Sequence, residues 1–178
     1  MVLAAWQAFT QSLNRQITQS LNDPMIRFTV DRMLGRLARM LRLLGYDTEY
    51  SPQMTTAHLQ EAARQGQRIV LTRGHAEKRF PGLANVFCVR SERAPEQLRE
   101  VVTQFKLDVR SGLWTRCTLC NATIERVEKA KVSDQVPPKV AEVYEDFYRC
   151  AGCGHIYWQG SHVERILKNL ATLLDVEP

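Results

Sequence analysis

The chain has 178 residues, of which 44% are hydrophobic and 24% charged, a mixture typical of a soluble globular protein. No stretch approaches the ~20 apolar residues of a membrane-spanning helix, and the first residues lack the basic segment of a secretory signal. The first 110 residues hold sixteen bases and ten acids, whereas the remainder holds eight bases and nine acids. This asymmetry predicts a polyanionic partner for the basic part, the alternative being a solvated surface with counterions. We expect a cytoplasmic protein with no membrane partner.

Apolar side chains recur at helical spacing over residues 3–21, and the segment Asn22-Asp23-Pro24 ends the pattern. The spacing predicts an amphipathic helix. Its polar face carries a single base, Arg15, which is too little charge for a helix that lies on a membrane surface. We expect residues 1–25 to form a helical extension that packs on the rest of the protein or on a partner.

From residue 26 onward, short β-type runs alternate with helical patterns. The expected strands cover residues 26–30, 47–50, 68–72 and 86–89, and the expected helices cover residues 33–44, 55–65 and 95–105. Gly45 and Gly66 follow the first two helices as typical end residues. This alternation predicts an α/β fold over residues 26–112, with a parallel sheet covered by helices on both faces. Cys88 falls in the fourth strand, where we interpret it as a buried apolar side chain.

Residues 113–178 have a different character, because they carry two C-x-x-C pairs and many turn residues. Cys117 and Cys120 form the first pair, and Cys150 and Cys153 form the second. Two such pairs supply the four thiolates of a tetrahedral site, which suits a structural Zn2+ ion. The alternatives are four buried structural cysteines or redox-active pairs. Two histidines, His155 and His162, lie near the second pair, but four thiolates already complete the site.

The two pairs are separated by 29 residues, more than the ~15–20 of a compact zinc finger. The extra length is expected to hold a short helix over residues 139–147. After the ribbon, residues 161–164 read SHVE, a capping box that predicts a final helix with one apolar face.

Two aspartates stand at the ends of the first two expected strands. Asp31 follows the first strand directly, Asp47 opens the second, and Glu49 lies within it. In parallel α/β sheets, chemistry gathers at the carboxyl ends of the strands. Carboxylates that converge there could hold Mg2+ or Mn2+ and activate water against a phosphodiester. The alternative for Asp31 is an N-cap of the following helix.

Four arginines share one side of the helix that follows Asp31. Arg32, Arg36, Arg39 and Arg42 fall within an arc of about 120° on a helical projection. The helix carries no acid of its own to pair with them, which favours contacts with phosphates. The alternative is pairing with acids from elsewhere in the fold.

Several long motifs resemble those of a known family. Residues 28–47 read FTVDRMLGRLARMLRLLGYD, residues 68–73 read RIVLTR, residues 116–121 read RCTLCN and residues 147–162 read FYRCAGCGHIYWQGSH. They resemble the opening motif, the third-strand motif and the zinc ribbon of the Mut7-C RNase domain family, over about residues 26–170. The resemblance implies a PIN-like α/β fold with a C-terminal zinc ribbon, and a metal-dependent ribonuclease activity.

The acidic positions depart from the family pattern. Gly74 stands where the family usually has an aspartate, and Thr55-Thr56-Ala57 stands where it usually has an acidic pair. Of the implied cluster only Asp31 and Asp47 remain, with Glu49 or Glu61 as the candidates for compensation. Loss of carboxylates lowers both the affinity for a divalent ion and the activation of water.

These observations predict an RNA-associated protein of ribonuclease descent, with cleavage weakened or absent. Asp31 would be the principal metal ligand, and Asp47 a second ligand or a structural acid. The expected RNA-binding residues are Arg32, Arg36, Arg39, Arg42 and Arg73. The alternative is a non-catalytic module that docks on the ribosome or on a protein complex through the zinc ribbon or the N-terminal helix.

Overall fold

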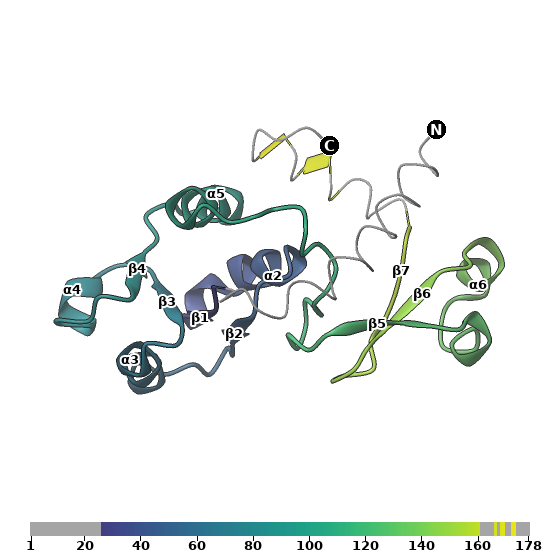
Figure 1. The fold of residues 1–178 in the computed structure, drawn as a ribbon, viewed down its shortest axis with the longest axis horizontal. Coiled ribbons are helices and arrows are strands. Elements are labelled where there is room, and N and C mark those ends of the chain that lie inside the picture. Colours follow the sequence, from purple (N-terminus) through teal and green to yellow (C-terminus); the bar gives the residue numbers. More distant parts are fainter. Residues whose placement is uncertain (1–25, 161–165, 167, 170–171, 174–178) are drawn as a thin grey trace.

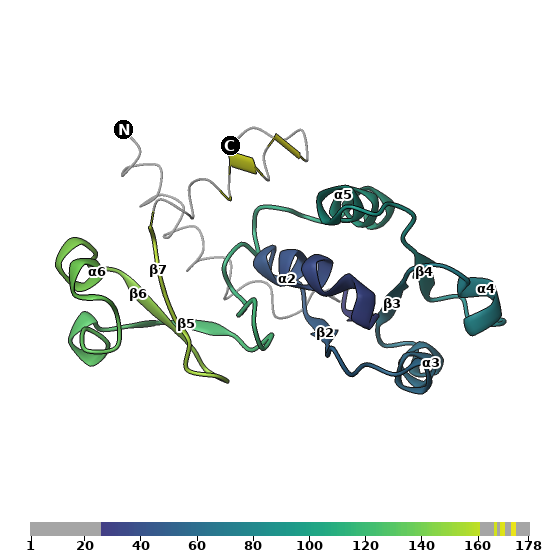
Figure 2. The same ribbon diagram turned by 180° about the vertical axis from the view of Figure 1, so that it is seen from behind.

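The computed structural model describes residues 26–160, 166, 168–169 and 172–173. The helix expected over residues 3–21 and the capping box at residues 161–164 lie outside the described residues. The described chain builds an α/β unit, from β1 to α5, and a smaller three-stranded unit that carries the four cysteines, here called the cysteine unit (Figures 1 and 2).

The α/β unit has a four-stranded parallel sheet in the order β2-β1-β3-β4, which confirms the predicted parallel sheet. Its strands are β1 (Phe28–Val30), β2 (Thr48–Tyr50), β3 (Ile69–Thr72) and β4 (Val86–Cys88). Cys88 lies in the edge strand β4 and is only half-buried, whereas we expected it to be fully buried.

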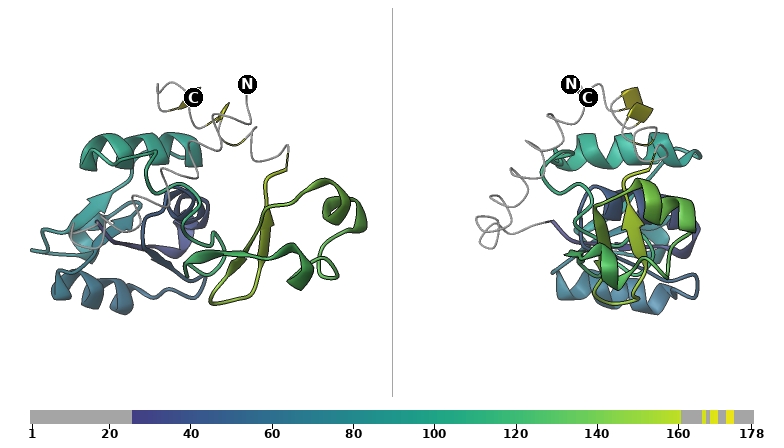
Figure 3. Two further views of the ribbon diagram at one scale, coloured as in Figure 1. Left: turned by 45° about the vertical axis from the view of Figure 1, so that its right-hand side comes forward. Right: turned by 90° about the vertical axis from the view of Figure 1, so that its right-hand side faces the viewer.

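Helices cover both faces of this sheet, as predicted (Figures 1 and 3). The helical elements are η2 (Arg32–Leu34), α2 (Gly35–Leu43), α3 (Thr56–Gln65), α4 (Ala76–Arg79) and α5 (Ala94–Phe105). The single turn α4 was not predicted, because four residues are too few to show a helical period.

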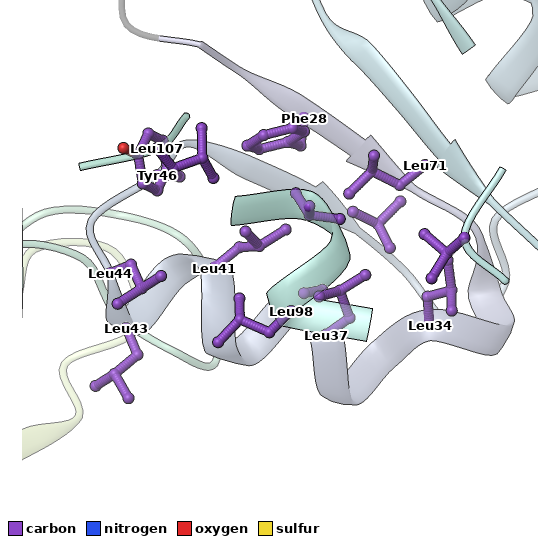
Figure 4. Close-up of a cluster of buried hydrophobic side chains, with 14 of the residues drawn as sticks. Phe28, Leu34, Leu37, Leu41, Leu43, Leu44, Tyr46, Leu71, Leu98 and Leu107 are labelled. Atoms are coloured by element: carbon purple, nitrogen blue, oxygen red, sulfur yellow. The ribbon is translucent and has the colours of Figure 1, made fainter. Parts of the chain in front are cut away.

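The main core lies between the sheet and the helices α2 and α5. Phe28 and Val30 of β1 face this side and are fully buried. Figure 4 shows Phe28 among the other side chains of this core. From α2, Leu37 and Leu41 meet them at helical spacing, and Leu98 closes the core from α5. Because side chains alternate along a strand, Thr29 points to the opposite face, where its hydroxyl donates to Glu49 of β2, a neighbour of His58 in α3. Asp31, two residues on, continues on that same face.

The cysteine unit is an antiparallel sheet with its own small core. It contains β5 (Ile124–Val127), β6 (Phe147–Cys150) and β7 (Ile156–Trp158), with η3 (Lys129–Lys131) and α6 (Pro138–Val143) between β5 and β6. The helix expected over residues 139–147 is too long, since it ends at Val143. Phe147 instead opens β6, where it is fully buried against Val132 and Val136.

Gly45, which follows α2, lies very close to the segment that connects α5 to the cysteine unit. Its backbone has φ +93°, and a Cβ atom there would lie 2.1 Å from the carbonyl oxygen of Gly112. Gly66, which follows α3, has a similar φ of +69° but open space around it. Alanine at Gly66 would therefore meet only the cost of a left-handed backbone, whereas alanine at Gly45 would also clash with Gly112.

We predict that Gly66→Ala lowers the free energy of unfolding by about 1 kcal/mol, the cost of the left-handed backbone alone. Gly45→Ala should cost roughly 3 kcal/mol or more, because the main chain must also move away from Gly112. Urea denaturation of both variants measures the difference. Equal losses would show that the contact with Gly112 relaxes freely.

Candidate metal centre and candidate nucleic-acid interface

The four predicted cysteines come together in the cysteine unit. The sulfur atoms of Cys117, Cys120, Cys150 and Cys153 all lie within 4.8 Å of one another. The Cys120 and Cys150 sulfurs are 3.2 Å apart, and those of Cys117 and Cys153 are 3.7 Å apart. No disulfide is formed. Four convergent thiol sulfurs fit a tetrahedral ion, and this donor set suits Zn2+.

Each cysteine pair sits on a tight turn of the same design. The amide of Asn121 donates to the carbonyl of Cys117 at 2.9 Å, and the amide of Gly154 donates to the carbonyl of Cys150 at 3.1 Å. Both Asn121 and Gly154 have φ +73°. This left-handed residue turns the chain away after the second cysteine of each pair, so that both sulfurs face the same point.

Hydrogen bonds around the first turn favour the thiolate form of its cysteine. Burial raises the pKa of Cys117, but hydrogen bonds from Tyr157 and from the amides of Cys120 and Leu119 outweigh it and lower the pKa to about 6. The Tyr157 hydroxyl lies 3.1 Å from the Cys117 sulfur. In the same cluster, burial and neighbouring sulfur atoms raise the pKa of Cys150 and of Cys153. A thiolate is the metal-binding form of cysteine, so these contacts prepare Cys117 in particular for a cation.

Neither histidine is needed to complete the site. The ring of His155 packs edge-on against Tyr157, with ring centroids 4.7 Å apart, and His162 lies outside the described residues. A closed site of four thiolates leaves no open position for a substrate or a reactive water. The centre is therefore suited to a structural role.

Hydrogen bonds from Arg42 connect the first cysteine turn to the α/β unit. The Arg42 guanidinium donates to the carbonyl of Thr48 at 2.9 Å and to those of Thr118 and Leu119 at 3.2 and 2.8 Å. Arg42 is only 3% exposed. Arg42 lies at the edge of the arginine arc and points inward to the first cysteine turn, so its guanidinium is not accessible to RNA in this structure and does not support the predicted binding role.

Asp47 belongs to the same junction. Arg68 donates to both of its carboxylate oxygens, at 3.0 and 2.8 Å, and Asn121 donates to one of them at 2.8 Å. Burial raises the pKa of Asp47, but these hydrogen bonds and the charges of Arg68 and Arg116 outweigh it and lower the pKa. A carboxylate held in this way is a structural acid.

Asp31 lies at the other end of the sheet, so the structure does not bring Asp31 and Asp47 together. In the parallel register Phe28 pairs with Thr48 and Val30 with Tyr50. Asp47 therefore precedes one strand, whereas Asp31 follows its neighbour. Because opposite ends of a parallel sheet carry the two carboxylates, the structure favours the second of the two roles expected for Asp47, that of a structural acid.

The Asp31 carboxylate is buried among hydroxyls and one guanidinium. Its Oδ2 accepts hydrogen bonds from Thr72 Oγ1 at 2.8 Å and from Arg79 Nη1 at 2.6 Å. The Asp31 side chain does not cap the following helix. Asp31 therefore stands at the N-cap position of η2, but its carboxylate is used elsewhere.

The two candidates to replace the missing carboxylates, Glu49 and Glu61, have other partners. Glu49 accepts from Thr29 at 3.1 Å and lies 3.0 Å from the ring of His58. Glu61 is exposed on α3, where it pairs with Arg64. Within residues 26–160 and the few later ones described, the four cysteines are the one group of three or more potential ligands close enough to share an ion.

Three of the predicted arginines form a free cationic face on η2 and α2. Arg32, Arg36 and Arg39 are all exposed, and none of them makes an ion pair with an acid in the described part of the chain. We call these three residues the arginine face. Arg73 is half-exposed and pairs with the exposed Glu92 at 2.6 Å. For the three residues of the arginine face, the described part of the chain therefore offers no support for the alternative of pairing with acids from elsewhere in the fold.

A family model, the Mut7-C RNAse domain, matches residues 26–170. The chain belongs to the Mut7-C RNase domain family. This confirms the resemblance seen in the sequence motifs. Searches of curated proteins and of solved structures return no match to the chain. None of the helices in its described part combines the length and the apolar character needed to cross a bilayer.

We predict about one equivalent of zinc per chain in protein purified without added metal, because four convergent thiolates bind Zn2+ tightly. Cys150→Ser should lose the ion and unfold the cysteine unit, since metal binding and folding are coupled in such sites. Cys88→Ser is the matched control, because Cys88 lies outside the cluster and should keep the full equivalent. A metal content near zero under reducing conditions would contradict the prediction.

Proposed function

We propose that this member of the Mut7-C RNase domain family binds RNA through the arginine face and has weakened or lost metal-dependent cleavage. The observation that carries the proposal is the set of three exposed arginines without acidic partners in the described chain. Arginine is well suited to phosphate, because its planar fork matches the phosphate oxygens and keeps its charge.

The position of the arginine face adds to this support. Helix η2 begins one residue after Asp31, so Arg32 lies at the carboxyl end of β1, where parallel sheets usually bind ligands. Arg36 and Arg39 extend the charge along α2. Arg73 follows β3 at the same sheet edge, and its surface ion pair with Glu92 is weak enough for a phosphate to displace.

The four-cysteine centre is proposed to hold a structural Zn2+ ion, and the proposed location is the cytoplasm, where reducing conditions keep the thiols available. A docking module for a protein complex or the ribosome is the second candidate. Two exposed apolar side chains of the cysteine unit favour it, Leu119 at 51% and Val143 at 69%. A pure docking module would bind single-stranded RNA poorly, so RNA affinity separates the two.

We predict that Arg36→Ala/Arg39→Ala weakens binding to single-stranded RNA of any sequence, by roughly tenfold at 0.1 M salt. Each lost phosphate contact should reduce the slope of log K against log salt by about 0.7. The matched control is Arg64→Ala/Arg93→Ala, which removes the same charge from residues already paired with Glu61 and Glu96. Fluorescence anisotropy measures both variants, and equal affinity in the two would refute the arginine face as the binding surface.

We predict that cleavage of labelled RNA in Mn2+ stays at the level seen with a chelator, because one carboxylate cannot bind and orient a divalent ion for hydrolysis. A gel assay over several hours measures this. Robust Mn2+-dependent cleavage that disappears in Asp31→Asn would show that the site still works.

A further inference from the structure

The Asp31 site already holds a cation that belongs to the protein. Arg79 Nη1 lies 2.6 Å from Asp31 Oδ2 and donates to Thr72 Oγ1 at 2.9 Å. Its Nη2 donates to Thr56 Oγ1 at 3.0 Å. One carboxylate oxygen and two hydroxyl oxygens thus surround the guanidinium. Hard oxygen atoms of this kind are also the ligands that Mg2+ and Mn2+ prefer.

Burial makes a cation necessary at this point. The Asp31 side chain is 4% exposed and the Arg79 side chain 26% exposed. A carboxylate taken out of water is costly unless a positive charge accompanies it. The Arg79 guanidinium supplies one charge and the carboxylate one opposite charge, so the pair is neutral.

Arg79 is anchored from several sides. The left-handed backbone of Gly74 and His75 precedes α4, which places Arg79 at its last position. The side chain of Gln60 donates to the Arg79 carbonyl at 2.7 Å, and the guanidinium lies 5.2 Å from the ring centre of the buried Phe80. The guanidinium is thus part of a packed arrangement.

We propose that Arg79 is the resident cation of the Asp31 site and excludes a divalent metal ion from it. The residues present do not fit the metal that the family implies, because Asp31 Oδ2, Thr72 Oγ1 and Thr56 Oγ1 are already hydrogen-bond acceptors of Arg79. A divalent ion beside Arg79 would bring three positive charges to one carboxylate. This inference deepens the proposed function, since it gives the physical reason for the loss of cleavage.

The test measures Mn2+ binding after a second carboxylate is placed at position 56, in the presence and in the absence of Arg79. It uses the zinc-loaded full chain without RNA. Thr56→Asp should show no Mn2+ binding, because the added carboxylate pairs with Arg79. Thr56→Asp/Arg79→Ala should bind Mn2+ at least about tenfold more tightly than wild type, because two carboxylates then face a vacated cation position. Adding Asp31→Asn to this variant should abolish the gain. Isothermal titration and Mn2+ electron paramagnetic resonance measure binding.

Two results would overturn the inference. The first is Mn2+ binding by wild type or by Thr56→Asp, if adding Asp31→Asn to that protein removes the binding. The second is a folded Thr56→Asp/Arg79→Ala variant that does not bind Mn2+. A double-mutant cycle on thermal stability covers the case in which that variant does not fold. Arg79→Ala should lower the melting temperature much less in an Asp31→Asn background than in wild type. Arg64→Ala is the surface control. If Arg79→Ala lowers the melting temperature equally in both backgrounds, the inference is also overturned. RNA is absent from all these measurements, so failure of the arginine face would leave their outcome unaffected.

Discussion

The buried guanidinium of Arg42 is the interaction on which the arrangement of the two units depends. It reaches from α2 to the carbonyls of Thr118 and Leu119, and thereby fixes the first cysteine turn against strand β2. Burial lowers the pKa of Arg42, which means that the surrounding carbonyl oxygens must offset the loss of hydration. Once this turn is fixed, Asn121 reaches the main chain of Thr48 and the carboxylate of Asp47. The four-cysteine centre and the packing of the α/β unit are therefore parts of one network.

The two ends of the parallel sheet have different tasks as a result. At the amino end, Asp47, Arg68 and Asn121 satisfy one another and join the units. At the carboxyl end, Asp31 pairs with Arg79, and Arg32, the first residue of the arginine face, follows Asp31 directly in the chain. The same residue types, an aspartate and an arginine, therefore serve structure at one end and the candidate site at the other.

Local sequence patterns predicted most of the fold, because the strands, the helices and the cysteine turns follow from short-range periodicity and spacing. Contacts between distant segments were harder to predict. Arg42 shares the helical arc of Arg36, and only the position of the cysteine turn, 76 residues later, shows that it is buried. Arg79 pairs with Asp31 across 48 residues and belongs to a single helical turn without a periodic signal. The separation of Asp31 from Asp47 could have been predicted from the sequence. Asp31 follows its strand and Asp47 precedes its strand, so in a parallel sheet they lie at opposite ends.

Replacing a divalent ion by a guanidinium changes what such a site can do. A metal ion polarises a phosphoryl oxygen and lowers the pKa of a bound water, which creates a nucleophile near neutral pH. A guanidinium donates hydrogen bonds and supplies charge, but it has no coordination position at which a water can be ionised. The Asp31–Arg79 pair is also neutral as a unit, so it does not repel the phosphates that the arginine face attracts. The proposed loss of cleavage and the proposed binding of RNA are therefore compatible, because Arg79 takes the place of a metal ion while the arginine face keeps its charge.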